Sequence, residues 1–367
     1  MNQTKILQVH QDTDHLVVTT SLSAMRFHFL WLRDNAPNSH SSNAQKLHES
    51  NTIESSIRPK NLAVDDYGLR VVWNDNTHAE YPVPFLCEHA YDVPENNNTP
   101  ATLWDSSIAV SASVHQYHEV RVNSIARRNW LNDVVTNGFS LLANVPAESG
   151  KILEVVELFG HVRETNYGKL FDVKVQEAAN NLAYTDRPLS VHTDNPYRDP
   201  CPTLQLLHCL RQGDSGGITA LVDGFAAAEK LRKIDPKAFK LLSEQEVTFR
   251  YESGDAILEA ESKIINLNKA GRPKSIRINN RSLAPLKIKF DIMLSYYEAL
   301  FKFRSLLEDQ SSQFRFCMQA GDLALFDNER VLHGRFGRST GERHLQGCYA
   351  ERDGLMSTLK TLYRTES

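Results

Sequence analysis

A polar stretch bounded by prolines, residues 94–100 (PENNNTP), interrupts the 367-residue chain. Such a stretch, without any hydrophobic period, is typical of a loop or linker. The chain is also longer than the roughly 100–200 residues of an ordinary domain. We therefore expect a small β-rich domain in residues 1–95, a linker over residues 96–123 and a larger domain in residues 124–367.

The composition excludes several classes of protein. Hydrophobic residues make up 41% of the chain and aromatic residues 9%, which is enough for a folded core. Lys and Arg number 41 against 45 Asp and Glu, so no basic excess favours nucleic-acid binding. No apolar run is long enough to span a membrane, and the N-terminus lacks a signal-peptide pattern. Five scattered cysteines without a C-x-x-C motif predict a cytoplasmic protein without disulfides.

Hydrophobic patterns predict a mainly β fold with flanking helices. Strands are expected at residues 15–20, 69–73, 203–210 and 323–326. Helices are expected at residues 124–137, 147–162, 223–231 and 291–307, the third with Asp223 as its N-cap. One face of the last helix would carry Leu294, Tyr297, Leu300, Phe301 and Leu307.

An H-x-D pattern is formed by His192 and Asp194 and indicates a metal site. In an extended strand, residues i and i+2 point to the same side, so both side chains can reach one ion. The distant His333 could complete a triad of two imidazoles and one carboxylate, which suits non-haem Fe(II) because coordination positions stay open. By itself the pattern is weak, since His10 and His78 begin similar ones.

Arg343 follows His333 by ten residues and suits a dicarboxylic cosubstrate, because a planar guanidinium pairs bidentately with a carboxylate. Thr219 could donate its hydroxyl to the same carboxylate. A zinc hydrolase could also use the two histidines and the aspartate, but Arg343 and Thr219 would then have no role in its reaction. A non-catalytic betaine-binding protein is a further alternative, although an intact ligand set argues against it.

The order of the motifs resembles the γ-butyrobetaine hydroxylase branch of the 2-oxoglutarate-dependent, TauD-like oxygenases. The matching segments are WLRDN (31–35), HTD (192–194), QLLHC (205–209), GG (216–217), VDGF (222–225), FDN (326–328), LHG (332–334), RHLQGCY (343–349) and Asp353. Over nearly the whole chain, this resemblance implies a double-stranded β-helix (jelly-roll) catalytic domain, Fe(II), 2-oxoglutarate, O2 and a homodimer. The implied site residues are His192, Asp194 and His333 for catalysis and the metal, and Arg343, Thr219 and Leu207 for the cosubstrate.

Members of this branch with zinc in the N-terminal domain carry cysteines just after the WLRDN segment. Here residues 36–40 read APNSH, and the first cysteine is Cys87. His78 lies near the position of the family's later zinc ligand. Because imidazoles without thiolates would leave zinc under-coordinated, we expect no structural zinc.

The resemblance also implies a substrate with a trimethylammonium group, held in an aromatic cage. A quaternary cation forms no hydrogen bonds and is best bound by ring faces. The matching positions are Tyr167, Phe171, Tyr184 and Tyr349, and Phe171 stands where a tryptophan is often found.

The anionic end of the substrate would meet a different set of residues. Asn195 stands beside the metal carboxylate, where γ-butyrobetaine hydroxylases tend to carry a bulkier residue, and Asn181 is a further substrate position. Asn279 and Asn280 match the family's asparagine segment, to which this chain adds Arg281. Amide donors with a guanidinium suit an anion with three oxygens. The resemblance thus favours 2-(trimethylamino)ethylphosphonate, hydroxylated next to the phosphonate, with γ-butyrobetaine as the alternative.

Overall fold

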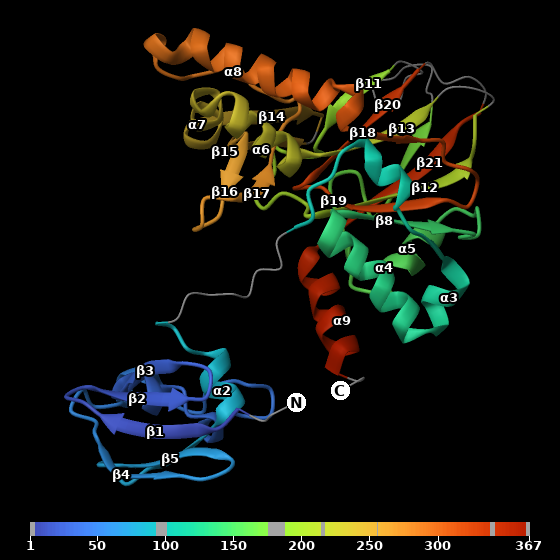
Figure 1. Ribbon diagram of the computed structural model, residues 1–367. Helices are drawn as coiled ribbons and strands as arrows, with labels where there is room; N and C mark the ends of the chain where they lie inside the picture. Colours follow the sequence, from blue (N-terminus) through green and yellow to red (C-terminus); the bar gives the residue numbers. More distant parts are fainter. Residues whose placement is uncertain are drawn as a thin grey trace. The chain divides into compact units, whose positions relative to one another are not determined.

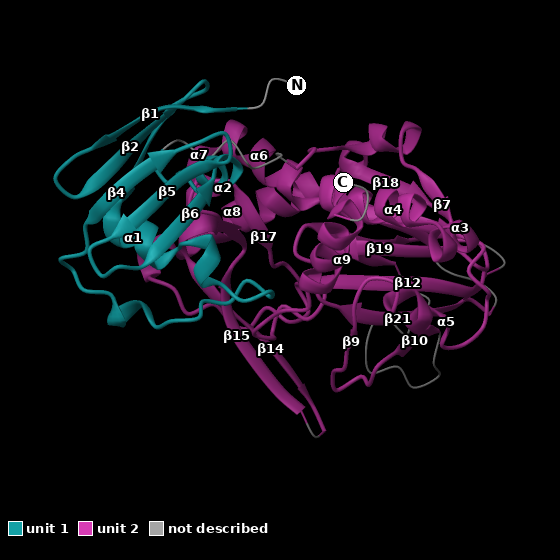
Figure 2. Cartoon of the chain, turned by 90° about the horizontal axis from the view of Figure 1, so that it is seen from below, with its two compact units in different colours: residues 1–99 teal, residues 100–367 magenta. Residues whose placement is uncertain are grey.

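The chain divides into two compact units, Met1–Thr99 and Pro100–Ser367, in its computed structural model (Figure 2). The structure describes residues 4–92, 101–174, 188–213, 217–254, 256–337 and 342–364. Each unit encloses hydrophobic core of its own. None of the described helices is long and apolar enough to cross a lipid bilayer.

Two three-stranded antiparallel sheets build the first unit, in the orders β1-β2-β3 and β4-β5-β6. Their strands are β1 (Ile6–Gln11), β2 (His15–Thr20), β3 (Ala24–His28), β4 (Pro59–Val64), β5 (Gly68–Trp73) and β6 (His78–Pro82). Helix α1 (Phe29–Asp34) follows β3, and α2 (Val83–Glu88) follows β6. Alternate residues of β2 and β5 are buried in one core, as a strand packed on one face requires.

Residues 101–123, predicted to lie in the linker, belong to the second unit and are folded. They form a 3₁₀ helix (Ser106–Val110), strand β7 (Val114–Gln116) and helix α3 (Tyr117–Val122). Trp104 is buried, and its indole N–H donates a hydrogen bond to the carbonyl oxygen of Asn137 at 2.6 Å. Elements this short show no clear hydrophobic period, so the sequence patterns miss them.

The second unit contains a seven-stranded and a four-stranded sheet (Figure 1). The larger sheet runs β10-β21-β12-β19-β8-β7, with β9 paired to β21, and only β7 is parallel to its neighbour. Its further strands are β8 (Phe139–Ala143), β9 (Val162–Arg163), β10 (Phe171–Lys174), β12 (Leu204–Arg211), β19 (Leu323–Asp327) and β21 (His344–Ala350). The smaller sheet runs β11-β20-β13-β18: β11 (Leu189–His192), β20 (Val331–Phe336), β13 (Ile218–Asp223) and β18 (Gln313–Phe316).

Side chains of both sheets share one core, so the sheets pack face to face, and helices cover their outer sides. Helices α4 (Ser124–Asn137), α5 (Lys151–Val156) and α9 (Arg352–Arg364) pack on the larger sheet (Figure 1). The smaller sheet packs against α6 (Gly224–Ile234), α7 (Pro236–Glu244) and α8 (Phe290–Glu308), together with β14 (Glu246–Ser253), β15 (Ala256–Lys263), β16 (Ile265–Leu267) and β17 (Pro273–Ile276). The prediction of a mainly β chain with flanking helices is confirmed.

Two helix predictions are wrong in detail. The helix expected over residues 147–162 is only α5, and a turn follows it. Along α8, the buried residues are Tyr296, Ala299, Leu300, Phe303 and Leu307. Of the predicted face, Leu294 is 77% exposed and Phe301 is 60% exposed. This helix is apolar on more than one side, so its periodicity alone does not tell which side packs.

Candidate active site

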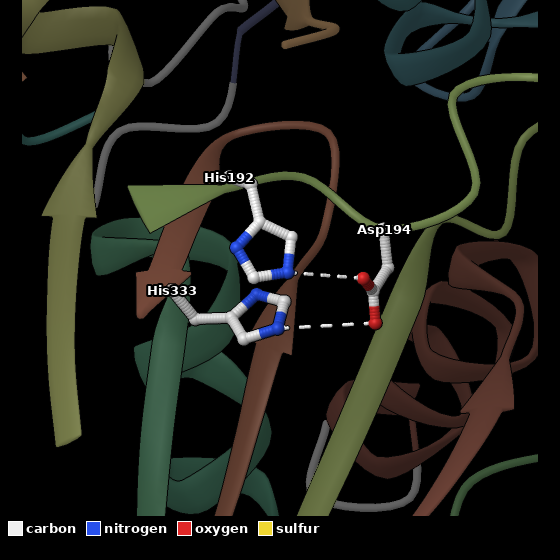
Figure 3. Close-up of side chains that lie close together, drawn as sticks. All are labelled: His192, Asp194 and His333. Atoms are coloured by element: carbon white, nitrogen blue, oxygen red, sulfur yellow. Dashed lines mark ion pairs between the residues drawn. The ribbon is translucent and has the colours of Figure 1, made fainter. Parts of the chain in front are cut away.

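His192 and His333 are direct partners across two neighbouring strands of the smaller sheet, β11 and β20. Their rings lie 4.4 Å apart between centroids. Nε2 of His192 is 3.3 Å from Oδ1 of Asp194, and Nε2 of His333 is 3.8 Å from its Oδ2 (Figure 3). One potential ligand atom from each of the three residues lies within 4.8 Å of the other two. The three side chains therefore converge closely enough to share one metal ion.

Asp194 reaches this point by a route that differs from the predicted one. Strand β11 ends at His192, so Asp194 does not lie in an extended strand with it. The chain turns after Asp194, and Asn195 has a left-handed backbone with φ 53°. Asparagine adopts this conformation more readily than most residues. The side chains meet because of this turn and not because of strand alternation.

The protonation states of His333 and Asp194 fit a divalent metal, and so does the hydrogen bond of His192. His192 donates from Nδ1 to the carbonyl oxygen of Ser190 at 2.9 Å, which leaves the lone pair of Nε2 for a metal. Burial and the charge of His192 lower the pKa of His333 to about 3. Burial raises the pKa of Asp194, but hydrogen bonding with His192 and the charges of His333 and Arg281 bring it below its ordinary value. A neutral imidazole at His333 and an ionised carboxylate at Asp194 are the forms of these groups that bind metal.

Within the described ranges, this triad is the one group of three or more His, Cys, Asp or Glu side chains with metal-binding spacing. In the first unit, His40 donates from Nδ1 to the carbonyl oxygen of Ala36 at 2.9 Å. Asn38 donates its amide to the carbonyl oxygen of His78, also at 2.9 Å. The bond from Asn38 joins residues 36–40 to β6, and the absence of structural zinc stays a prediction.

The triad opens into a cavity of about 630 Å³ between the two sheets. Most residues predicted from the sequence line it: His192, Asp194, His333, Arg343, Thr219, Leu207, Tyr167, Phe171, Asn195, Asn279, Arg281 and Tyr349. Asn280 is exposed and is not among the lining residues. Asn181 and Tyr184 lie outside the described residues.

One part of the cavity is strongly basic. Arg343 and Arg335 both line it, and Thr219 is the cross-strand partner of Arg335. Burial and the charge of Arg335 lower the pKa of Arg343 to about 10, so Arg343 stays cationic at neutral pH. Two neighbouring cations favour a dianionic ligand. The sequence reasoning missed Arg335, although its position two residues after His333 in a strand is a usable signal.

Aromatic rings form another wall of the cavity. Phe171 lies against Gly347, its cross-strand partner, and its ring centroid is 5.2 Å from that of Tyr349. The ring of Tyr167 is 6.1 Å from Phe171 and 6.0 Å from Tyr251. These faces come from three separate parts of the chain.

Two rings of this wall were not predicted from the sequence. Tyr251 of β14 stacks on Tyr197 at 4.9 Å, and both line the cavity. Tyr197 stands three residues after Asp194, which could have marked it as a site residue. No sequence signal connects Tyr251 with the site, because only packing brings β14 to the cavity.

Polar groups continue from these rings toward the metal triad. The hydroxyl of Tyr197 lies 3.1 Å from that of Tyr167 and donates to Oδ1 of Asn195 at 2.7 Å. Nδ2 of Asn195 is buried and has no hydrogen-bond partner among the described residues. Asn279 is used locally, since Nδ2 donates to the carbonyl oxygen of Thr193. Arg281 is exposed but also lines the cavity, and its positive charge helps to lower the pKa of Asp194.

Known proteins match both units of the chain. A family model described as "Taurine catabolism dioxygenase TauD, TfdA family" matches residues 98–349, and one described as "Gamma-butyrobetaine hydroxylase-like, N-terminal" matches residues 7–87. Gamma-butyrobetaine dioxygenase of Pseudomonas sp. (strain AK-1) is 34% identical over 349 residues, covering 92% of this chain and 91% of the relative. Gamma-butyrobetaine dioxygenase of Homo sapiens is 31% identical, covering 91% and 90%. Mitochondrial trimethyllysine dioxygenase of Homo sapiens is 30% identical, covering 96% and 86%.

Proposed function

The chain belongs to the TauD/TfdA dioxygenase family, and from this premise we propose that it hydroxylates a small trimethylammonium zwitterion. As a member of that family, it is a 2-oxoglutarate-dependent dioxygenase that uses Fe(II), 2-oxoglutarate and O2. We assign the iron to His192, Asp194 and His333. The convergence of these three groups in the wall of one cavity is the observation that carries the proposal.

The iron, when bound, supplies the oxidative chemistry, and the protein positions the reactants and excludes water. We assign the distal carboxylate of 2-oxoglutarate to Arg343, with Thr219 as a second donor and Leu207 as an apolar wall. The positive charge of Arg335 beside Arg343 supports this assignment, because 2-oxoglutarate is a dianion. Family membership favours this reaction over the zinc hydrolase and the non-catalytic binding protein.

For the substrate, we propose that the cage of Tyr167, Phe171 and Tyr349 holds the trimethylammonium group. The relatives named for γ-butyrobetaine and trimethyllysine support a substrate of this class. Tyr184 also matches a cage position by resemblance and stays a prediction. The cage binds one end, so the carbon to be hydroxylated is the one held toward the iron.

For the anionic end, we propose Asn195 and Arg281, with 2-(trimethylamino)ethylphosphonate as the substrate and hydroxylation next to the phosphonate. The unpartnered Nδ2 of Asn195 and the guanidinium of Arg281 on the cavity wall support three-oxygen recognition. Asn279 contributes less, because its amide is engaged by Thr193. γ-Butyrobetaine is the second candidate substrate, because two of the similar proteins are gamma-butyrobetaine dioxygenases.

The test is succinate release with 2-(trimethylamino)ethylphosphonate and γ-butyrobetaine offered side by side. We expect a higher kcat/KM for the phosphonate. Arg281→Ala should lower kcat/KM for the phosphonate at least about tenfold more than for the carboxylate, since hydrogen bonds to charged groups contribute about 1.5–3 kcal/mol each. A preference for γ-butyrobetaine, or equal losses in the variant, would refute the phosphonate assignment and leave the dioxygenase intact.

We also propose that the two sheets form a double-stranded β-helix. In support, the strands β10, β11, β12 and β13 alternate between the sheets, and so do β18, β19, β20 and β21. The first unit would be the γ-butyrobetaine hydroxylase-like N-terminal domain that its family match indicates. The homodimer implied by resemblance stays a prediction.

A further inference from the structure

The carboxylate of Asp194 is held asymmetrically. Its Oδ2 accepts a hydrogen bond from Nε2 of Gln205 at 2.8 Å and another from the hydroxyl of Tyr349 at 3.0 Å. Its Oδ1 lies 3.3 Å from Nε2 of His192, and its Oδ2 lies 3.8 Å from Nε2 of His333. Because a carboxylate oxygen that already accepts two hydrogen bonds has little capacity left, Oδ1 is the oxygen available to a metal.

The register of the larger sheet aims both donors at this oxygen. Gln205 of β12 and Tyr349 of β21 are direct cross-strand partners. Along β12, the neighbours Leu204 and Leu206 pack in the outer core under the helices, so Gln205 points to the interior. Gln205 is 1% exposed and Tyr349 is 4% exposed, so neither donor is displaced by bulk water.

The backbone of Asp194 is held as well. Its N–H donates to Oδ1 of Asn328 at 2.8 Å, and its carbonyl oxygen accepts from Nδ2 of Asn328 at 2.9 Å. Asn328 is fully buried, and its Nδ2 also donates to the carbonyl oxygen of Pro202 at 2.9 Å. With the peptide fixed on both sides, rotation of the carboxylate is the freedom that remains, and the two donors on Oδ2 remove it.

We propose that Gln205 is a positioning residue that, with the hydroxyl of Tyr349, restricts Asp194 to a single oxygen as metal ligand. This inference rests on the proposed metal site. A carboxylate that bound through both oxygens would occupy a further coordination position. With iron bound, the cosubstrate and O2 would need three positions, and single-oxygen binding by Asp194 would leave them open. Tyr349 then has two tasks, since its ring belongs to the aromatic cage and its hydroxyl to the metal ligand.

The experiment is an anaerobic titration with Mn(II), in which free ion is followed by electron paramagnetic resonance, on the full chain. Gln205→Leu should weaken Mn(II) binding about 10- to 100-fold, the usual effect of removing a partner of a metal ligand. Tyr349→Phe keeps the ring, removes only the hydroxyl and should weaken binding less. The double variant should lose more free energy of Mn(II) binding than the two single variants together, because Oδ2 then has neither the Gln205 nor the Tyr349 donor.

Gln346→Leu is the matched control. Gln346 is also a buried glutamine of the larger sheet, and its amide bonds to Ser149, Asp172 and the N–H of Gly150, away from the triad. We expect its Mn(II) affinity to match that of the parent within about twofold. Equal weakening by Gln205→Leu and Gln346→Leu, or none by Gln205→Leu, would overturn the positioning role.

Asp194→Ala separates this inference from the proposed function. If that variant binds Mn(II) like the parent, the metal site itself is wrong. If it loses binding while Gln205→Leu keeps it, only the positioning role is wrong. Should Gln205→Leu not fold, as thermal unfolding of the metal-free variants will tell, Tyr349→Phe decides the question, and unchanged affinity there overturns the proposal.

Discussion

Gly347→Ala tests whether the aromatic wall binds the substrate. A Cβ atom at this position would lie 2.5 Å from Cε2 of Phe171 and closer still to its Cζ. The backbone of Gly347 is paired on both sides, with Phe171 in β10 and with Leu207 in β12, so it cannot retreat easily. The ring of Phe171 must move instead.

The size of the effect follows from this geometry. Nonbonded carbon atoms prefer separations of about 3.5–4.0 Å, so the ring of Phe171 has to shift by about 1 Å or more. It would then lose its place beside Tyr349. A cation–π contact is worth about 0.5–2 kcal/mol, and its loss corresponds to a rise of about 2- to 30-fold in the KM of the trimethylammonium substrate.

The assay measures the KM of the substrate and the dissociation constant of 2-oxoglutarate in four proteins: the parent, Gly347→Ala, Phe171→Ala and the double variant. Gly347→Ala should raise the KM in the parent background and leave 2-oxoglutarate binding unchanged. In the Phe171→Ala background, the added methyl group has no ring to displace, so no further rise is expected. A further rise of equal size there would refute the reasoning.

Three further predictions concern stability and the cosubstrate. Arg330→Met should lower the free energy of unfolding by about 3–5 kcal/mol in urea titrations, because it leaves the buried carboxylate of Asp223 without its cation; a loss below about 1 kcal/mol would contradict this. Arg343→Ala should raise the dissociation constant of 2-oxoglutarate at least about tenfold in calorimetry without affecting Mn(II) binding, and an unchanged constant would clear Arg343 of its role. Burial lowers the pKa of His208 to about 4, so the folded state favours the neutral ring. The free energy of unfolding should therefore fall by about 3 kcal/mol as the pH falls from about 6.5 to about 4. In urea titrations over this pH range, His208→Leu should lack this loss of about 3 kcal/mol.

The sequence predicts the triad well because its members lie in motifs with a fixed order. His192 and Asp194 are close in the chain, and the resemblance identifies His333. The turn that brings Asp194 into place could not be predicted, since it depends on Asn328 from a different part of the fold. Gln205 belonged to a matching motif, but only the strand register reveals what its amide touches.

The predictions about the fold that were wrong or incomplete share a physical cause. Helix α8 has apolar residues on more than one side, so the packing of neighbouring elements decides that Tyr296 is buried and Leu294 is not. Tyr251 enters the cavity wall because β14 packs there, and no local pattern records such a contact. Local sequence constrains elements and motifs, and tertiary packing decides which faces meet.

The pairing of β11 with β20 has a consequence for how this protein is made. His192 and His333 face each other although they lie about 140 residues apart in the chain, and contacts of such long range close late because of their entropic cost. During synthesis, the ribosome must release almost the entire polypeptide before both imidazoles can come together. A product that stops before β20 would keep His192 and Asp194 but lack His333, the third member of the triad.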